Sequence, residues 1–127
     1  MTAGTMQVSW LVELTVRPGR LGDFEKLTGE MVDAASGERG VLAYQRFISE
    51  DQQTVYVHER YEDSAAAVAH LRTFTATFAE RYASMADRNR FVVFGEPSDD
   101  LRALLDRYGA TYHRPFGRFP YWGDTRS

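Results

Sequence analysis

The sequence contains no cysteine, and Lys26 is its only lysine. Without cysteine, the chain cannot form a disulfide bond, use a thiolate nucleophile or bind a metal through sulfur. No apolar run approaches the roughly 20 residues that a membrane-spanning helix needs, and Met1 to Gln7 lack the pattern of a signal peptide. The net charge is −3 and there is no basic cluster of the kind that binds nucleic acid. We therefore expect a cytoplasmic protein with neither a membrane nor a nucleic-acid partner.

Motifs for metals and cofactors are also missing. The three histidines, His58, His70 and His113, do not have the spacing of a metal-binding pair. The glycines at 37 and 40 precede a predicted strand, whereas a phosphate-binding loop leads into a helix N-terminus. We expect no metal and no bound cofactor.

The hydrophobic pattern predicts one α+β domain spanning residues 1–127. Alternation predicts strands, and apolar residues at helical spacing predict helices. The expected elements are a strand over 7–16, a helix over 21–35, strands over 41–48 and 54–61, a helix over 65–86 and a strand over 90–95. This β-α-β-β-α-β order is typical of the ferredoxin-like fold with an antiparallel sheet, and it places the core of the domain within residues 6–96.

Residues 97–127 follow this core and differ from it in composition. Ser98, Asp99 and Asp100 can cap a short helix that includes Leu101 and Leu105. Residues 112–122 are too aromatic for a disordered end and too rich in proline and glycine for regular structure. We interpret them as an extended arm that lies on its own sheet, on a partner subunit or at the mouth of a pocket.

Two helices can cover only one face of a four-stranded sheet. The residues predicted for the other face are unusually apolar, whereas a solvated sheet face normally alternates with polar residues. The candidates are Leu11, Leu42 or Ala43, Tyr44, and Val55 or Tyr56. A second copy of the chain is the simplest cover for such a face, so we expect a homodimer, with a monomer as the alternative.

Glu59 and His70 are the candidate catalytic residues. Glu59 shares a predicted strand face with Val55 and Val57, and burying a carboxylate there is costly unless it is paired. It can act as a base, or it can be a structural carboxylate. His70 lies one helical turn before Phe74 and can act as a general acid or base, or it can be satisfied by a backbone carbonyl or a carboxylate.

Aromatic residues recur on these same elements and can line a pocket for a flat ligand, although aromatics at such spacings also build ordinary cores. The candidates for substrate binding are Trp10, Tyr44, Tyr61, Phe74 and Phe78. Tyr56 is a further aromatic of this set.

Three segments of the sequence carry a recognisable pattern. They are Gly40-Val41-Leu42-Ala43-Tyr44, the stretch Val57-His58-Glu59-Arg60-Tyr61-Glu62-Asp63, and Ala69-His70-Leu71 followed by Phe74 and Phe78. Together they resemble the antibiotic biosynthesis monooxygenase (ABM) domain. The resemblance covers about residues 6–96. It implies a dimeric α+β barrel, in which two ferredoxin-like sheets face each other with their helices outside.

The resemblance also implies a function: a cofactor-independent monooxygenase that oxidises a quinol or an aromatic polyketide-type small molecule with dioxygen. Positions that haem-degrading relatives need correspond to Leu14, His70 and Glu80 and differ here. Positions implicated in polyketide-oxidising relatives correspond to Val57, Tyr61 and Ala67, and only the aromatic character of Tyr61 is kept. Two alternatives are a non-redox cyclase or isomerase of the same superfamily and a non-catalytic dimer that binds a small ligand.

Overall fold

The computed structural model describes residues 6–117. Its elements, in chain order, are β1 (Val8–Val16), α1 (Leu21–Ser36), β2 (Val41–Ile48), β3 (Thr54–Tyr61), α2 (Ser64–Thr77), α3 (Ala79–Met85), β4 (Ala86–Phe94), α4 (Asp99–Asp106) and β5 (Thr111–His113).

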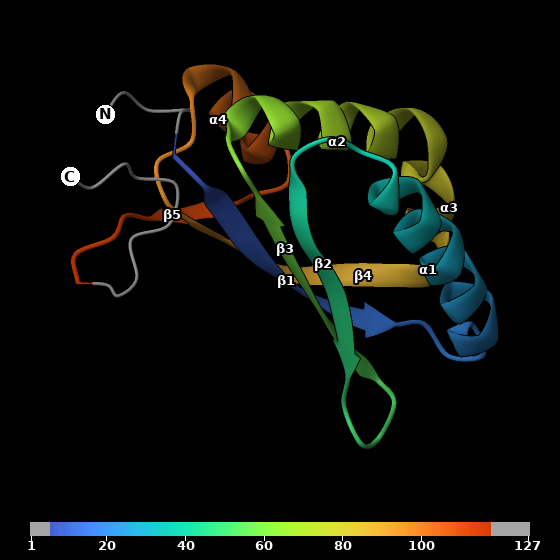
Figure 1. Cartoon of the computed structure of the whole chain (residues 1–127). Coiled ribbons are helices and arrows are strands. Elements are labelled where there is room, and N and C mark those ends of the chain that lie inside the picture. The colour runs from blue at the N-terminus through green and yellow to red at the C-terminus, as the bar shows by residue number, and fades with distance from the viewer. Residues whose placement is uncertain (1–5, 118–127) are drawn as a thin grey trace.

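The strands form one sheet in the order β2-β3-β1-β4-β5 (Figure 1). The first four strands pair antiparallel, and β5 adds to the edge of β4 in parallel. This arrangement confirms the predicted ferredoxin-like α+β fold. The parallel fifth strand was not predicted as a strand, because three residues are too few to show a period.

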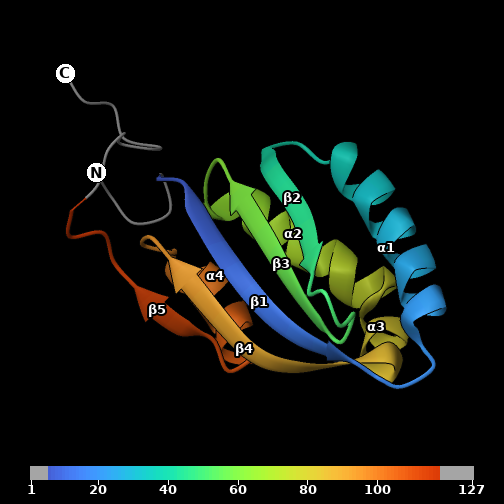
Figure 2. The ribbon, with the colours of Figure 1, turned by 90° about the horizontal axis from the view of Figure 1, so that it is seen from below.

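The helices lie on one face of the sheet, and the core lies between the two layers (Figures 1 and 2). Alternate side chains of β1 point into this layer, so that Trp10 and Leu14 are fully buried. From the helical side, α1 contributes Phe24, Leu27 and Met31 at helical spacing. The apolar residues that alternate along the strands and those that recur along the helices therefore pack together in one layer.

The second helix is interrupted, whereas the sequence predicted one helix over 65–86. α2 ends at Thr77, Phe78 has non-helical angles (φ −120°, ψ −25°), and α3 begins at Ala79. Phe78 and Tyr82, four residues apart, are both buried on either side of this break. β4 also begins at Ala86 instead of residue 90, because its polar first half hides the strand pattern.

The other face of the sheet is not covered by any element within residues 6–117 (Figure 2). Large apolar side chains are exposed on it: Phe47 to 55%, Phe94 to 42% and Tyr56 to 37%. Phe47 and Tyr56 lie opposite each other on β2 and β3. Leu11 also lies on this face, as expected, whereas the strand register places Tyr44 and Val55 on the helical side.

The C-terminal part of the described chain returns to the same sheet. The hydroxyl of Ser98 accepts a hydrogen bond from the backbone N–H of Leu101 and begins α4. β5 then places the start of the predicted arm against its own sheet, and Phe116 beyond it is almost fully exposed (99%). The rest of the arm, residues 118–122, lies outside the described residues.

No helix within residues 6–117 is long and apolar enough to cross a membrane.

A substitution at Gly40 tests how much the conformation of the turn between α1 and β2 contributes to stability. It has φ +84°, and a Cβ there would lie 2.6 Å from Ala66 Cβ and 2.9 Å from Glu62 Oε1. We expect Gly40→Ala to lower the free energy of unfolding by about 3 kcal/mol, because left-handed strain adds to a steric clash. Urea unfolding measures this loss.

Gly109→Ala is the matched control. Gly109 has φ +70° but open space around it, so only the strain of about 1 kcal/mol should remain. Equal losses in the two variants would show that the close packing at Gly40 contributes nothing.

Candidate functional site

A small cavity, about 30 Å³ in volume, lies between the sheet and the helices. It is lined by aromatic and aliphatic side chains together with a few charged ones. The lining residues are Trp10, Val12, Met31, Tyr44, Arg46, Val57, Glu59, His70, Leu71, Phe74, Tyr82, Arg88, Phe91 and Tyr108.

Most of the residues proposed from the sequence meet at this cavity. Both candidate catalytic residues line it, as do Trp10, Tyr44 and Phe74. Tyr61 is fully buried and does not line the cavity. Its hydroxyl bonds to Glu59, which does line it. Phe78 is buried at the α2–α3 break and does not line the cavity.

Glu59 lies on the core face of β3, where alternation places it between Val57 and Tyr61. It is one of three polar side chains buried in the described chain. The Tyr61 hydroxyl donates a hydrogen bond of 2.5 Å to Glu59 Oε1, and the Trp10 indole also bonds to this carboxylate. These donors offset part of the cost of removing the carboxylate from water.

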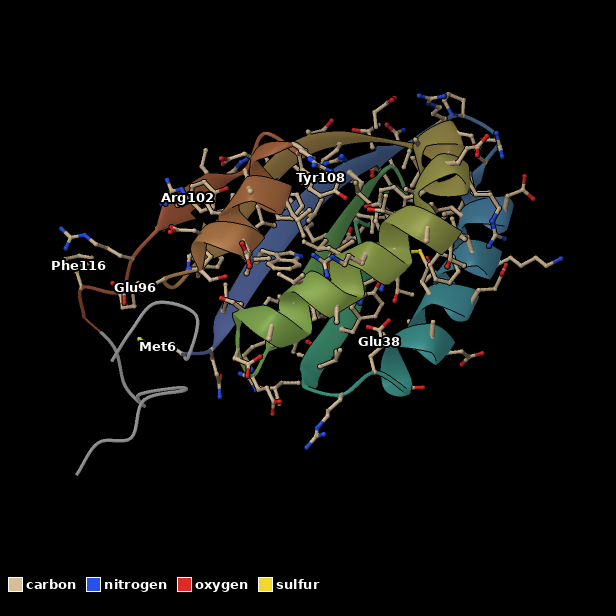
Figure 3. All side chains as sticks on the ribbon, turned by 90° about the horizontal axis from the view of Figure 1, so that it is seen from above. Met6, Glu38, Glu96, Arg102, Tyr108 and Phe116 are labelled. Carbon is tan, nitrogen blue, oxygen red and sulfur yellow. The ribbon has the colours of Figure 1, made fainter. Side chains whose placement is uncertain are left out.

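His70 lies on α2 with its ring between two carboxylates. Nε2 is 3.4 Å from Glu59 Oε1, and Nδ1 is 2.6 Å from Glu38 Oε1. Glu38 comes from the turn between α1 and β2, and its side chain is 20% exposed (Figure 3). Glu38, His70, Glu59 and Tyr61 thus form a carboxylate–histidine network that runs from near the surface into the cavity.

The electrostatics of this network favour its ionised form. Burial alone would raise the pKa of Glu59, but His70, Tyr61 and Trp10 reverse this effect and lower it below 4.5. Burial alone would lower the pKa of His70, but Glu59 and Glu38 raise it above 6.5. Burial and the Glu59 charge raise the pKa of Tyr61, which therefore stays a hydrogen-bond donor.

Arg46 and Tyr44 form a second polar group on the neighbouring strand β2. Nη2 of Arg46 donates to the Tyr44 hydroxyl at 3.0 Å, and its Cζ lies 4.2 Å from the centre of the Tyr44 ring. Burial raises the pKa of Tyr44 to about 12, so its phenol remains protonated.

Glu38 and Arg46 were missed by the sequence reasoning. Arg46 carries the same signal as Glu59, a charged residue on the apolar face of a strand, since it follows Tyr44 by two positions. Glu38 lies in a turn, and nothing in its local pattern indicates that it contacts His70.

A larger groove, about 490 Å³ in volume, adjoins the cavity. The two share Phe74, Tyr82, Arg88 and Tyr108. Tyr108 follows α4 (Figure 3); its ring stacks on Phe91 at 5.7 Å, and the Arg88 guanidinium lies 4.8 Å from its centre. The segment after the core thus supplies part of the wall that separates the cavity from the groove.

No cluster of three or more histidine, aspartate and glutamate side chains that could hold a metal ion occurs in the part of the chain that the structure describes. What the cavity offers chemically is a buried carboxylate beside a histidine whose pKa is raised by Glu59 and Glu38, together with a guanidinium and flat apolar walls. This set is suited to proton transfer with an aromatic ligand.

The network predicts how stability depends on pH. Because the pKa of His70 is raised, its stabilisation is complete below about pH 6.5 and is lost as the pH rises through the folded-state value. Because the pKa of Glu59 is lowered, its contribution is present above about pH 4.5 and is lost as the pH falls through the folded-state value. Breaking a buried pair costs about 3 kcal/mol, so we expect His70→Asn to lose that much near pH 5.5 and less near pH 8.5, measured by urea unfolding.

His113→Asn is the control, because His113 is exposed on β5 and its hydrogen-bond partner is Thr111 instead of a carboxylate. It should leave the pH dependence unchanged. A His70→Asn variant with the same stability loss at both pH values would contradict the charged state that we assign to His70.

Solved structures with the same fold confirm this architecture. MupZ from Pseudomonas fluorescens superposes with a TM-score of 0.78 at 19% identity, over 90% of this chain and 93% of its own. SnoaB, a cofactor-independent oxygenase from Streptomyces nogalater, gives 0.63 at 14% identity, over 73% of this chain and 95% of its own. PA3566 from Pseudomonas aeruginosa gives 0.58 at 20% identity, over 69% of this chain and 89% of its own.

The likeness to MupZ extends past the core, because its 90% share of this chain exceeds what residues 1–97 could supply. No curated protein matches the sequence. The sequence model of the family described as antibiotic biosynthesis monooxygenase matches residues 8–81, which is more than half of the chain. The chain therefore belongs to the antibiotic biosynthesis monooxygenase family.

Proposed function

We propose that this protein is a cofactor-independent monooxygenase that oxidises a quinol or an aromatic polyketide-type small molecule with dioxygen. The observation that carries the proposal is the buried Glu59 carboxylate, paired with His70 at an aromatic-lined cavity. Membership of the family supports it, and so does the fold shared with SnoaB.

In this reaction the substrate is itself the reductant. Glu59 accepts the proton of a substrate hydroxyl, and the resulting anion is electron-rich enough to reduce dioxygen. In an anthrone-type substrate a ring CH₂ group becomes C=O, and the two hydrogens leave with the second oxygen atom as water. In a quinol a ring C–H becomes C–OH while the two quinol hydroxyls become carbonyls, and the second oxygen atom again leaves as water with two hydrogens. The protein binds and orients the ring between Trp10, Tyr44 and Phe74 and positions the base.

The partly exposed end of the network gives the proton a connection to solvent. His70 lies between the buried Glu59 and Glu38, which is 20% exposed. The charge on His70 also limits the cost of keeping Glu59 ionised while the cavity is dry. Glu59 is the catalytic base in this proposal, while His70, itself paired with Glu38, keeps Glu59 ionised.

Access to Glu59 requires the wall of the cavity to move. A volume of about 30 Å³ corresponds to a single water molecule, whereas the adjoining groove has about 490 Å³. Rotation of Tyr108 away from Phe91 would join the two and admit a ring. We propose that the groove is the entrance.

A second candidate, a non-redox cyclase or isomerase, is favoured by one observation: a carboxylate and an imidazolium lie 3.4 Å apart at the same cavity. Such a pair supplies a proton acceptor and a donor and needs no oxidant. The mass of the product separates the two reactions. Conversion of CH₂ to C=O adds about 14 Da, isomerisation leaves the mass unchanged, and dehydrative cyclisation lowers it by one water.

Oxygen consumption tests the monooxygenase directly. With a panel of hydroquinones and anthrones, we expect substrate-dependent oxygen uptake by the wild-type protein and about a 100-fold lower rate for Glu59→Gln, because general base catalysis is lost. His70→Ala should also slow the reaction. Mass spectrometry of the products identifies the added oxygen.

Glu62→Gln serves as the control, because Glu62 is an exposed carboxylate next to β3. It should keep wild-type activity. Wild-type protein that consumes no oxygen with any substrate of the panel contradicts the proposal, as does Glu59→Gln with full activity; a retained ligand without turnover would instead indicate a binding protein.

We also propose a homodimer that forms through the open face of the sheet, as in a dimeric α+β barrel. Phe47→Asp places a charge at the most exposed of the large apolar side chains on this face and should convert the dimer to a monomer in sedimentation experiments. Val32→Asp is the matched control, since Val32 is an exposed apolar residue on α1 (38%). A monomeric wild-type protein, or a Phe47→Asp variant that stays dimeric, would count against this interface.

A further inference from the structure

Arg46 has two hydrogen-bond donors for which the protein provides no acceptor. Its Nε and Nη1 atoms are buried and have no partner within the described residues. Only Nη2 is engaged, by the Tyr44 hydroxyl at 3.0 Å and the Met31 sulfur at 3.8 Å. An unsatisfied buried donor is costly, and more so on a charged group, so the arrangement needs an explanation.

The position of Arg46 places it beside the proposed base. The strand register pairs Tyr44 with Glu59 and Arg46 with Val57, so Arg46 and Glu59 are diagonal neighbours on the same face of the sheet. Diagonal side chains start about 7–8 Å apart, and no ion pair joins these two among the described residues. Both line the cavity, so a ligand inside it lies beside both side chains.

The charges around the cavity favour an oxyanion inside it. Glu38 and Glu59 carry two negative charges, whereas protonated His70, Arg46 and Arg88 carry three positive charges. One negative charge on a ligand oxygen therefore balances the site. Transfer of a proton from a phenol or enol to Glu59 creates such an oxygen and leaves the total charge unchanged.

We propose that Arg46 is a catalytic residue that binds the oxyanion formed when Glu59 deprotonates a phenolic or enolic substrate. The O–H bond of the substrate breaks, the proton passes to the Glu59 carboxylate, and the electron pair stays on the substrate oxygen. That oxygen then accepts a hydrogen bond from a free N–H of Arg46. Charge-assisted donors of this kind act most strongly in a site that excludes water. This role rests on the proposed function and narrows its substrates to compounds with an ionisable hydroxyl.

The test uses 4-nitrophenol, whose ionised form absorbs visible light and whose neutral form absorbs in the near ultraviolet. Titration of the full-length protein with this probe at several pH values gives the affinity for each form. We expect the wild-type protein to prefer the phenolate, and Arg46→Gln to lower the ratio of phenolate to phenol affinity at least tenfold. Arg46→Lys keeps a charge and the aliphatic stem, so its ratio should lie between these values.

Arg72→Gln is the control, because Arg72 is an exposed arginine on α2; it should behave as wild type. Melting temperatures confirm that each variant is folded, and Arg46→Lys keeps the test valid if Arg46→Gln is not. Equal ratios in the wild-type protein and the folded Arg46 variants would overturn the proposal and leave Arg46 as a support for Tyr44. Failure of the wild-type protein to bind either form at millimolar concentration would also overturn it.

The experiment separates this inference from the reaction on which it rests. Phenolate binding that depends on Arg46, in a protein that consumes no oxygen, would support the oxyanion site while removing the monooxygenase proposal. Oxygen uptake that is unchanged in Arg46→Gln, together with unchanged phenolate binding, would remove the oxyanion site alone.

Discussion

The ionised Glu59 carboxylate inside an apolar layer is the constraint on which the rest of the site depends. A carboxylate in such a place is tolerated only with several donors around it. Tyr61 and Trp10 supply two of them from the same sheet, and His70 supplies a charge from the helical layer. The contacts of Glu59 therefore tie α2 to the sheet. The geometry of the site and the packing of the fold depend on the same contacts.

The turn between α1 and β2 also belongs to the network around Glu59, in addition to the sheet and α2. Glu38 can reach Nδ1 of His70 only if the turn lies close to the first turns of α2. Gly40 makes that approach possible, since its missing side chain leaves room for Ala66, and its carbonyl accepts a hydrogen bond from the backbone of Glu62. A glycine outside the cavity thus contributes to the charge state of a histidine inside it.

Periodicity in the sequence was sufficient to predict the ferredoxin-like order and to place Glu59 and His70 on inward faces, because both depend on alternation along a single element. Periodicity failed to predict features that depend on contacts between elements distant in the sequence. The break at Phe78 has no signal in the hydrophobic pattern, because Phe78 and Tyr82 continue the same helical stripe. Glu38 and Tyr108 reach the site from irregular segments whose partners are set only when the layers pack.

Tyr108 lies outside the part of the chain that matches the family, so family membership says little about the part of the cavity that it lines. The family match ends at residue 81, within α3, whereas part of the wall between cavity and groove comes from Arg88 and Tyr108. The lining of the cavity therefore comes partly from residues that the family pattern does not include. At 14–20% identity, these solved structures share the fold with this chain, so in our proposal the selection of a ligand depends on the local side chains.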